Sequence, residues 1–138
     1  MKFVPYLSFN GQCREAFAFY ADVLGGEIVA MIAHGETPAA GHFGAEHDHL
    51  IINAHLVADG AELMGADTPP AMGPSKLQGF CVSIQIDDEP RAEGIFTALA
   101  EGGSVLMPFE PSFWAKKFGM VTDRFGTPWM INCGLAAA

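Results

Sequence analysis

Residues 4–30, VPYLSFNGQCREAFAFYADVLGGEIVA, and residues 81–107, CVSIQIDDEPRAEGIFTALAEGGSVLM, decide the fold because they share one arrangement of residue types. In each stretch a strand-like run precedes a segment with helical spacing, a Gly-Gly pair and a second apolar run. The Gly-Gly pairs, at 25–26 and 102–103, lie 77 positions apart. This repeat predicts two pseudo-symmetric copies of one unit, and such copies usually enclose a shared cleft.

Each copy is predicted to contain one amphipathic helix that covers a sheet on one side. In the first helix, over about residues 12–24, apolar side chains recur on one stripe: Cys13, Phe17, Tyr20 and Leu24. In the second, over about 90–100, the stripe consists of Ala92, Ile95, Phe96 and Leu99. Asn10 or Gly11 is expected to cap the first helix, and each Gly-Gly pair is expected to end a helix.

Two short strands joined by a tight turn close each copy. In the first copy, runs at about 50–57 and 61–65 flank a hairpin turn at Asp59-Gly60. In the second copy, runs at about 119–122 and 129–132 flank a four-residue turn that begins at Asp123. Each half therefore reads as a strand, a helix and three further strands.

The predicted fold class is α+β, with two tandem βαβββ modules in a single domain that spans residues 1–138. Module one covers about 1–67, a Pro- and Gly-rich linker covers about 68–79, and module two covers about 80–134. Residues 34–49 are expected to form a loop inserted in module one. The length of 138 residues is sufficient for one substantial apolar core.

The charge balance narrows the class of partner. Half of the residues are hydrophobic, 17% are charged, and acidic residues outnumber basic ones by 16 to 7, which gives a net charge of −9. This field repels phosphate backbones and anionic lipid, so nucleic acid and membrane surfaces are not expected as partners. A small molecule or another protein is expected instead.

Cysteine usage and the N-terminal region predict a cytoplasmic protein. The three cysteines, Cys13, Cys81 and Cys133, are widely spaced and odd in number, so they are expected to be small buried side chains in a reducing compartment. The N-terminus does not have the pattern of a signal peptide. No apolar stretch approaches the roughly 20 residues that a membrane-spanning helix needs.

Several motifs resemble those of a known superfamily. They are Pro5–Gly11 followed by Ala16–Tyr20, the segment His34–Pro38, Phe113-Trp114-Ala115, and Gly119–Met130. With the βαβββ repeat, they resemble the vicinal-oxygen-chelate superfamily, which includes glyoxalase I, bleomycin-resistance proteins and extradiol dioxygenases. Within it the chain looks like the PhnB-like proteins, also described as 3-demethylubiquinone methyltransferase-like.

The resemblance implies a glyoxalase-like curved mixed sheet around a cleft and a homodimer. Enzymes of the superfamily usually hold a divalent metal with two histidines and two carboxylates, so the resemblance raises the question of whether this chain keeps such a site. These ligands come from the first and last strands of each copy. No Gly-rich loop opens a helix in this chain, so the sequence does not predict a nucleotide cofactor.

Strand alternation identifies the cleft-facing residues of the first strands. In the first copy Leu7 and Phe9 are expected to pack under the helix, so Tyr6 and Ser8 face the cleft. The repeat offset gives the corresponding residues of the second copy, Ser83 and Gln85. On the closing strands, the fourth residue after the turn glycine is a methionine in both copies, Met64 and Met130.

The four positions that correspond to metal ligands are therefore Tyr6, Met64, Ser83 and Met130. None is an imidazole or a carboxylate, and a thioether is a poor ligand for the metals of such nitrogen and oxygen sites. The sequence thus predicts that the protein has lost the metal site, and no cofactor is expected.

All five histidines lie between positions 34 and 55. His42, His47 and His49 share the inserted loop with Glu46 and Asp48, a composition that fits either a solvated polar loop or a transition-metal site. His55 lies centrally in the apolar run 51–57. It fits either a hydrogen-bonded packing residue or a donor or base that faces the pocket, and the family resemblance favours the second.

The leading hypothesis is a protein that binds a small organic molecule without a metal. The expected polar groups are Tyr6, His55, Glu62, Ser83, Gln85 and Asn132, and the expected walls are Met64, Phe113, Trp114 and Met130. One alternative is a lyase, isomerase or dioxygenase with a displaced metal on His55, Glu62 and a loop histidine. A second alternative is a structural or regulatory homodimer with a filled cleft.

Two other residues have structural interpretations. Trp129 is expected to pack under a helix, because it neighbours the cleft-facing Met130. Asp123 is expected to fit the hairpin turn. Asp67, like Glu110 and Asp123, has no evident partner in the sequence.

Overall fold

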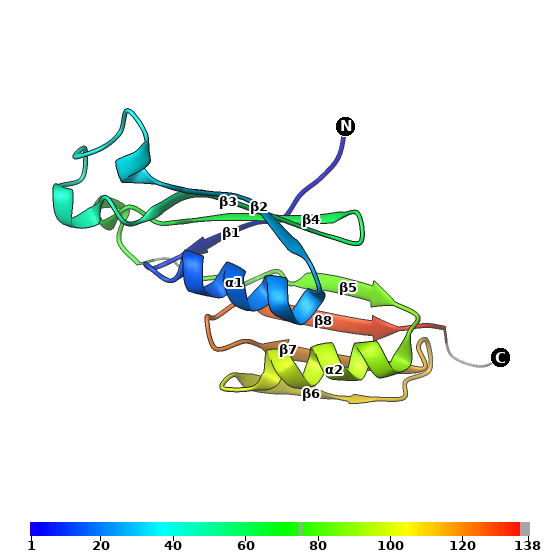
Figure 1. Cartoon of the computed structure of the whole chain (residues 1–138). Helices are drawn as coiled ribbons and strands as arrows, with labels where there is room; N and C mark the ends of the chain where they lie inside the picture. The colour runs from blue at the N-terminus through cyan, green and yellow to red at the C-terminus, as the bar shows by residue number, and fades with distance from the viewer. Residues whose placement is uncertain (75, 136–138) are drawn as a thin grey trace. The chain divides into compact units, whose positions relative to one another are not determined.

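The structure is a computed structural model that describes residues 1–74 and 76–135 (Figure 1). The chain divides into two compact units, Met1–Lys76 and Leu77–Ala138. Within the described residues, each unit contains one strand, one α-helix and three further strands in that order. Each is described by itself below.

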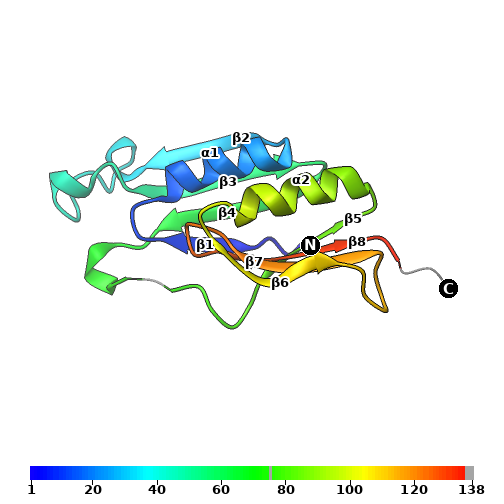
Figure 2. The same ribbon diagram turned by 90° about the horizontal axis from the view of Figure 1, so that it is seen from below.

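Unit one forms a four-stranded mixed sheet with one long helix. Its elements are β1 (Tyr6–Phe9), α1 (Cys13–Leu24), β2 (Glu27–Ala33), β3 (Ile51–Ala58) and β4 (Ala61–Asp67). The strand order is β1-β4-β3-β2, with β1 parallel to β4 and the other pairs antiparallel. Figure 2 shows α1 lying along β2 and β3 of this sheet. Three short 3-10 helices, η1 (His34–Glu36), η2 (Ala45–His47) and η3 (Pro70–Met72), lie in the connecting loops.

Unit two repeats this topology. Its elements are β5 (Val82–Ile86), α2 (Glu89–Ala100), β6 (Ser104–Glu110), β7 (Lys117–Thr122) and β8 (Pro128–Cys133). The strand order is β5-β8-β7-β6, again with only the first pair parallel. The prediction of an α+β protein with two βαβββ modules is confirmed.

Alternation of side chains gives each sheet one buried face. In unit one Leu7, Leu56 and Leu63 are buried, and α1 packs on the same sheet through Phe17 and Tyr20. In unit two α2 packs against β7 and β8 through the buried residues Ala92, Ile95 and Leu99. We call the opposite face of each sheet, which is turned away from its helix, the open face. As predicted, Tyr6 lies there while its neighbour Leu7 is buried.

The helix ends agree with the sequence in position, but two of them differ in mechanism. The residue that follows α2 is Glu101 in an extended conformation, and not a glycine of the Gly102-Gly103 pair. Gly25 ends α1 in the left-handed conformation, with φ of 65°. Neither Asn10 nor Gly11 caps the start of α1: the residue before the helix is Gln12, whose side chain makes no capping bond. The cap comes instead from Asp67 at the end of β4, whose Oδ1 accepts hydrogen bonds from the Gly11 and Cys13 amides, both at 3.0 Å.

The cysteine prediction needs one correction. Cys13 and Cys133 are buried, but Cys81 is only half-buried, because it lies directly before β5, at the edge of its sheet. All three are free thiols. Burial raises the pKa of the Cys13 thiol to about 12, and the nearby Asp67 carboxylate adds to this effect. None of the helices in the described part of the chain has the length and apolar character needed to cross a membrane.

Candidate functional site

The open face of unit one brings four predicted site residues together. In the pairing of β1 with β4, Tyr6 lies opposite Met64, and in the pairing of β4 with β3, Met64 lies opposite His55. These three residues therefore form one row across the sheet, with the methionine in the centre. The Tyr6 hydroxyl lies 3.4 Å from the carbonyl oxygen of Ile52 on β3, so its ring reaches across β4.

Glu62 holds the imidazole of His55. Its Oε1 lies 2.7 Å from His55 Nε2, and the exposed fractions of the two side chains are 16% and 25%. Lys2 contacts the second carboxylate oxygen. The hydrogen bond from Lys2, followed by that from His55, lowers the pKa of the Glu62 carboxyl. Because an ionised carboxylate only accepts hydrogen bonds, His55 Nε2 is the donor, and Nδ1 of the neutral ring keeps its lone pair.

The open face of unit two carries the second predicted polar group. Ser83 lies opposite Met130, and Gln85 lies opposite Asn132, in the parallel pairing of β5 with β8. The Gln85 amide donates to the Ser83 hydroxyl at 2.7 Å. A methionine thus lies beside hydroxyl or amide groups on the open face of each unit.

An aromatic cluster borders this face of unit two. The loop before β7 presents Phe113, 91% exposed, and Trp114, 40% exposed. Their rings pack edge to face with 4.6 Å between the ring centroids. Trp114 packs in the same way on Phe118, with 5.0 Å between the centroids. The Trp114 indole donates to Asn132 Oδ1 at 3.1 Å, which ties the loop to β8. Phe113 and Trp114 are therefore accessible aromatic side chains next to polar groups.

The loop histidines do not form a site with the predicted residues. Within residues 1–74 and 76–135, no group of three or more His, Cys, Asp or Glu side chains is placed to hold a metal ion. His47 lies 3.7 Å from Glu46 in an exposed pair. The side chains at Tyr6, Met64, Ser83 and Met130 do not fit the metal that the superfamily implies, because thioethers and neutral hydroxyls are poor ligands for a hard or borderline divalent ion.

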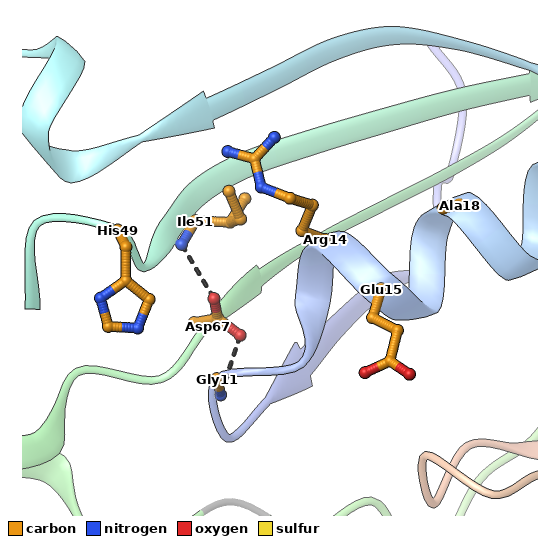
Figure 3. Close-up of a pocket in the computed structure, with 7 residues that line it drawn as sticks. All are labelled: Gly11, Arg14, Glu15, Ala18, His49, Ile51 and Asp67. Carbon is orange, nitrogen blue, oxygen red and sulfur yellow. Dashed lines mark hydrogen bonds between the residues drawn. The ribbon is translucent and has the colours of Figure 1, made fainter.

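A pocket that the sequence did not predict lies beside the first turns of α1 (Figure 3). Its volume is about 410 Å³, and its lining residues are Gly11, Arg14, Glu15, Ala18, His49, Ile51 and Asp67. Figure 3 shows the Asp67 carboxylate bonded to the amides of Ile51 and Gly11. Because its oxygens are used in these bonds, Asp67 acts here as a structural group.

The prediction that Asp123 fits the hairpin turn is confirmed, but the expectation that Asp67 and Asp123 lack partners was wrong. Asp67 does have partners: three backbone amides donate to it, those of Gly11, Cys13 and Ile51. Asp123 does more than fit a turn, since its Oδ2 also accepts from the indole of Trp129 at 2.8 Å. Trp129 itself is buried, as predicted. The sequence did contain a signal of the buried role of Asp67, because this acidic residue ends an apolar strand run.

Comparison with known proteins identifies the family. Residues 1–132 match the model of the family described as 3-demethylubiquinone-9 3-methyltransferase. The chain belongs to this family. The subgroup is PhnB-like, as the motifs indicated: the PhnB protein of Bacillus cereus is 25% identical, with a TM-score of 0.81 over 97% of this chain and 100% of that chain.

Two further relatives of this PhnB-like protein are more similar in sequence. The crystal structure of PA1353 from Pseudomonas aeruginosa has 46% identity and a TM-score of 0.90, and covers 97% of this chain and 98% of that chain. Protein YjdN of Escherichia coli is 36% identical over 140 residues, which cover 96% of this chain and 95% of the relative.

Proposed function

We propose that this PhnB-like protein binds a small organic molecule on its open sheet faces without the help of a metal ion. The observation that carries the proposal is the row of Tyr6, Met64 and His55, together with the pair of Ser83 and Met130. Thioether, hydroxyl and imidazole groups of this kind suit an uncharged organic ligand, with methionine as an adaptable apolar floor.

The side chains indicate the chemical character of the ligand. Trp114 and Phe113 offer aromatic faces, and Asn132, Gln85 and Ser83 offer hydrogen-bonding groups beside them. A planar, partly aromatic molecule with polar edges matches this combination. The net charge of −9 disfavours polyanionic ligands.

A methyl transfer from a nucleotide-type donor receives no support from the helix ends. The N-terminus of a helix is a ready site for the phosphate or carboxylate of a cofactor. Here the carboxylate of Asp67 accepts from the Cys13 amide, the first of α1, and from the preceding Gly11 amide, while the Asp88 side chain accepts from the Arg91 amide at the start of α2. The family description therefore does not by itself assign methyl transfer to this chain.

A thermal-shift screen tests the binding proposal. Against a set of small aromatic and heteroaromatic metabolites, at least one compound is expected to raise the melting temperature in a concentration-dependent way, because a ligand that binds only the folded state stabilises it by mass action. The shift is expected to be lost in Met64→Lys for a compound that binds on unit one, and in Trp114→Ala for a compound that binds on unit two. Phe80→Ala, which removes another half-exposed aromatic ring (46% exposed), is the matched control and should keep it. A screen without any such compound would count against the proposal.

Metal content gives an independent test. Protein purified without chelator is expected to contain well below one equivalent of tightly bound divalent metal, and EDTA is expected to leave its melting temperature unchanged. His55 and Glu62 alone supply too few ligands for a tight site. Elemental analysis that finds close to one equivalent, lost on replacement of His55 or Glu62 by alanine, would instead support the displaced-metal enzyme.

We also propose that the protein is a cytoplasmic homodimer, as the family resemblance implies. The edge strand β6 supports association, since Val105, Leu106 and Met107 are exposed in succession on it. A run of apolar residues on an unpaired edge is typical of a covered surface. The free thiols fit a reducing compartment.

A further inference from the structure

We propose that His55, oriented by Glu62, is a general base that removes a proton from a carbon acid bound on the open face of unit one, and that Tyr6 donates a hydrogen bond to the oxygen anion that forms. This inference rests on the proposed binding function and adds a reaction to it. All three residues belong to unit one, and the row through Met64 connects them.

Glu62 fixes the orientation of the His55 imidazole. Glu62 accepts the hydrogen of His55 Nε2 at 2.7 Å, and both side chains are mostly shielded from solvent. A carboxylate bound in this way fixes the ring and its tautomer, and it stabilises the imidazolium ion that forms when the ring takes up a proton. Within the described residues, Nδ1 accepts no hydrogen bond. It is the basic atom left for a ligand.

Tyr6 lies where it can donate a hydrogen bond to a ligand bound beside His55. His55 and Tyr6 lie on either side of Met64 in one row, and their Cα atoms are about 10 Å apart, since two strand spacings separate them. The Tyr6 hydroxyl reaches over β4 to the Ile52 carbonyl, but that contact is long at 3.4 Å. Burial raises the pKa of the Tyr6 hydroxyl, which therefore stays protonated and able to donate at neutral pH.

The proposed reaction balances without any further reactant. The proton moves from a C–H bond of the ligand to His55 Nδ1, and the electron pair of that bond moves through the ligand onto an electronegative oxygen. Tyr6 stabilises this oxygen, and the imidazolium then returns its proton to the ligand or to water. Neither an oxidant nor a metal takes part. The thioether of Met64 forms an apolar floor, which keeps both hydrogen bonds strong.

Ring opening of 5-nitrobenzisoxazole measures this step directly. A base removes the C3 proton, the electron pair forms the third bond of a nitrile, the N–O bond breaks, and a coloured phenolate is released. We expect His55→Ala and His55→Gln to lower kcat/KM by about 100-fold, the usual contribution of a positioned base. Glu62→Gln and Tyr6→Phe are each expected to lower it by about 10-fold.

Two further measurements separate a base from a structural residue. Free imidazole in solution should restore part of the rate in His55→Ala, because it can occupy the vacated space, whereas it should not affect the wild-type protein. His47→Ala removes a second histidine paired with a glutamate, the exposed pair with Glu46, and should leave the rate unchanged. Melting temperatures of all variants show that they are folded.

Binding is followed separately with 3-methyl-5-nitrobenzisoxazole, which lacks the reactive C–H. If this compound shifts the methyl resonance of Met64 but wild-type protein and His55→Ala open the reactive probe at equal rates, the general base is refuted and the binding function stands. If neither binding nor ring opening occurs, both the inference and the binding site on unit one are refuted. A His55-dependent rate that imidazole rescues supports the proposal.

Discussion

Replacement of Asp67 by alanine is expected to lower the free energy of unfolding by about 4 kcal/mol, since it leaves two buried amides and one partly buried amide without their acceptor. The carboxylate is only 4% exposed. Its Oδ1 binds the amides of Gly11 and Cys13 at 3.0 Å, and its Oδ2 binds that of Ile51 at 2.8 Å. One side chain at the end of β4 thus fixes the start of α1 and the start of β3.

Urea denaturation followed by circular dichroism measures this effect. Asp67→Asn keeps one acceptor oxygen but adds a donor, so we expect its free energy of unfolding to lie between that of the wild type and that of the alanine variant. Asp22→Ala removes an exposed carboxylate from α1 and is expected to change stability by less than about 0.5 kcal/mol. A loss below about 1 kcal/mol in Asp67→Ala would show that water satisfies these amides and that the carboxylate is not the organising group.

Much of the fold could be predicted because it depends on local and periodic signals. The spacing of apolar residues fixed both helices to within one residue at each end, and Gly25 ended α1 through its left-handed conformation. The turn at Asp59-Gly60, with φ of 51° and 78°, sets the register between β3 and β4. Counting from that turn placed Met64 on the open face, because a strand has a period of two.

The candidate site was predicted as a set of positions but not as a set of contacts. Alternation places His55 and Glu62 on one face, but it does not bring Nε2 to 2.7 Å from a carboxylate oxygen. That contact runs diagonally between the neighbouring strands β3 and β4. Lys2, which lies 60 positions before Glu62 in the sequence, also binds the Glu62 carboxylate. The tie between Trp114 and Asn132 depends on the course of a loop, for which the sequence gives no periodic signal.

Buried carboxylates were the largest omission, and the reason is physical. Asp67 binds amides that lie 56, 54 and 16 positions away, so its partners meet only after the sheet and the helix have packed. Sequence patterns place an acidic residue at a strand end or a turn, where solvent is its usual partner. A buried carboxylate that is fully hydrogen-bonded instead joins elements that are distant in the sequence.

Replacement of Asp123 by alanine is also expected to lower the free energy of unfolding of unit two by about 4 kcal/mol. The reason is that this carboxylate accepts hydrogen bonds from both backbone and side-chain donors. The carboxylate is 3% exposed. Its Oδ1 accepts from the Phe125 amide at 2.9 Å and from the Thr127 amide at 3.1 Å, which closes the turn between β7 and β8. Its Oδ2 accepts from the buried indole of Trp129, so the same substitution removes this acceptor from an N–H in the core.

Tryptophan fluorescence distinguishes loss of the bond between Asp123 and Trp129 from loss of the turn hydrogen bonds alone. In a Trp114→Phe background, Trp129 is the remaining tryptophan, and Asp123→Ala is expected to shift its emission to the red and to lower the denaturation midpoint. Asp123→Asn keeps an acceptor oxygen and should retain more of the stability. Asp87→Ala, which removes an exposed carboxylate beside α2, is the control and should change neither quantity. If Asp123→Ala lowers stability while the emission stays unchanged, the carboxylate stabilises only the turn, and the bond to Trp129 contributes little.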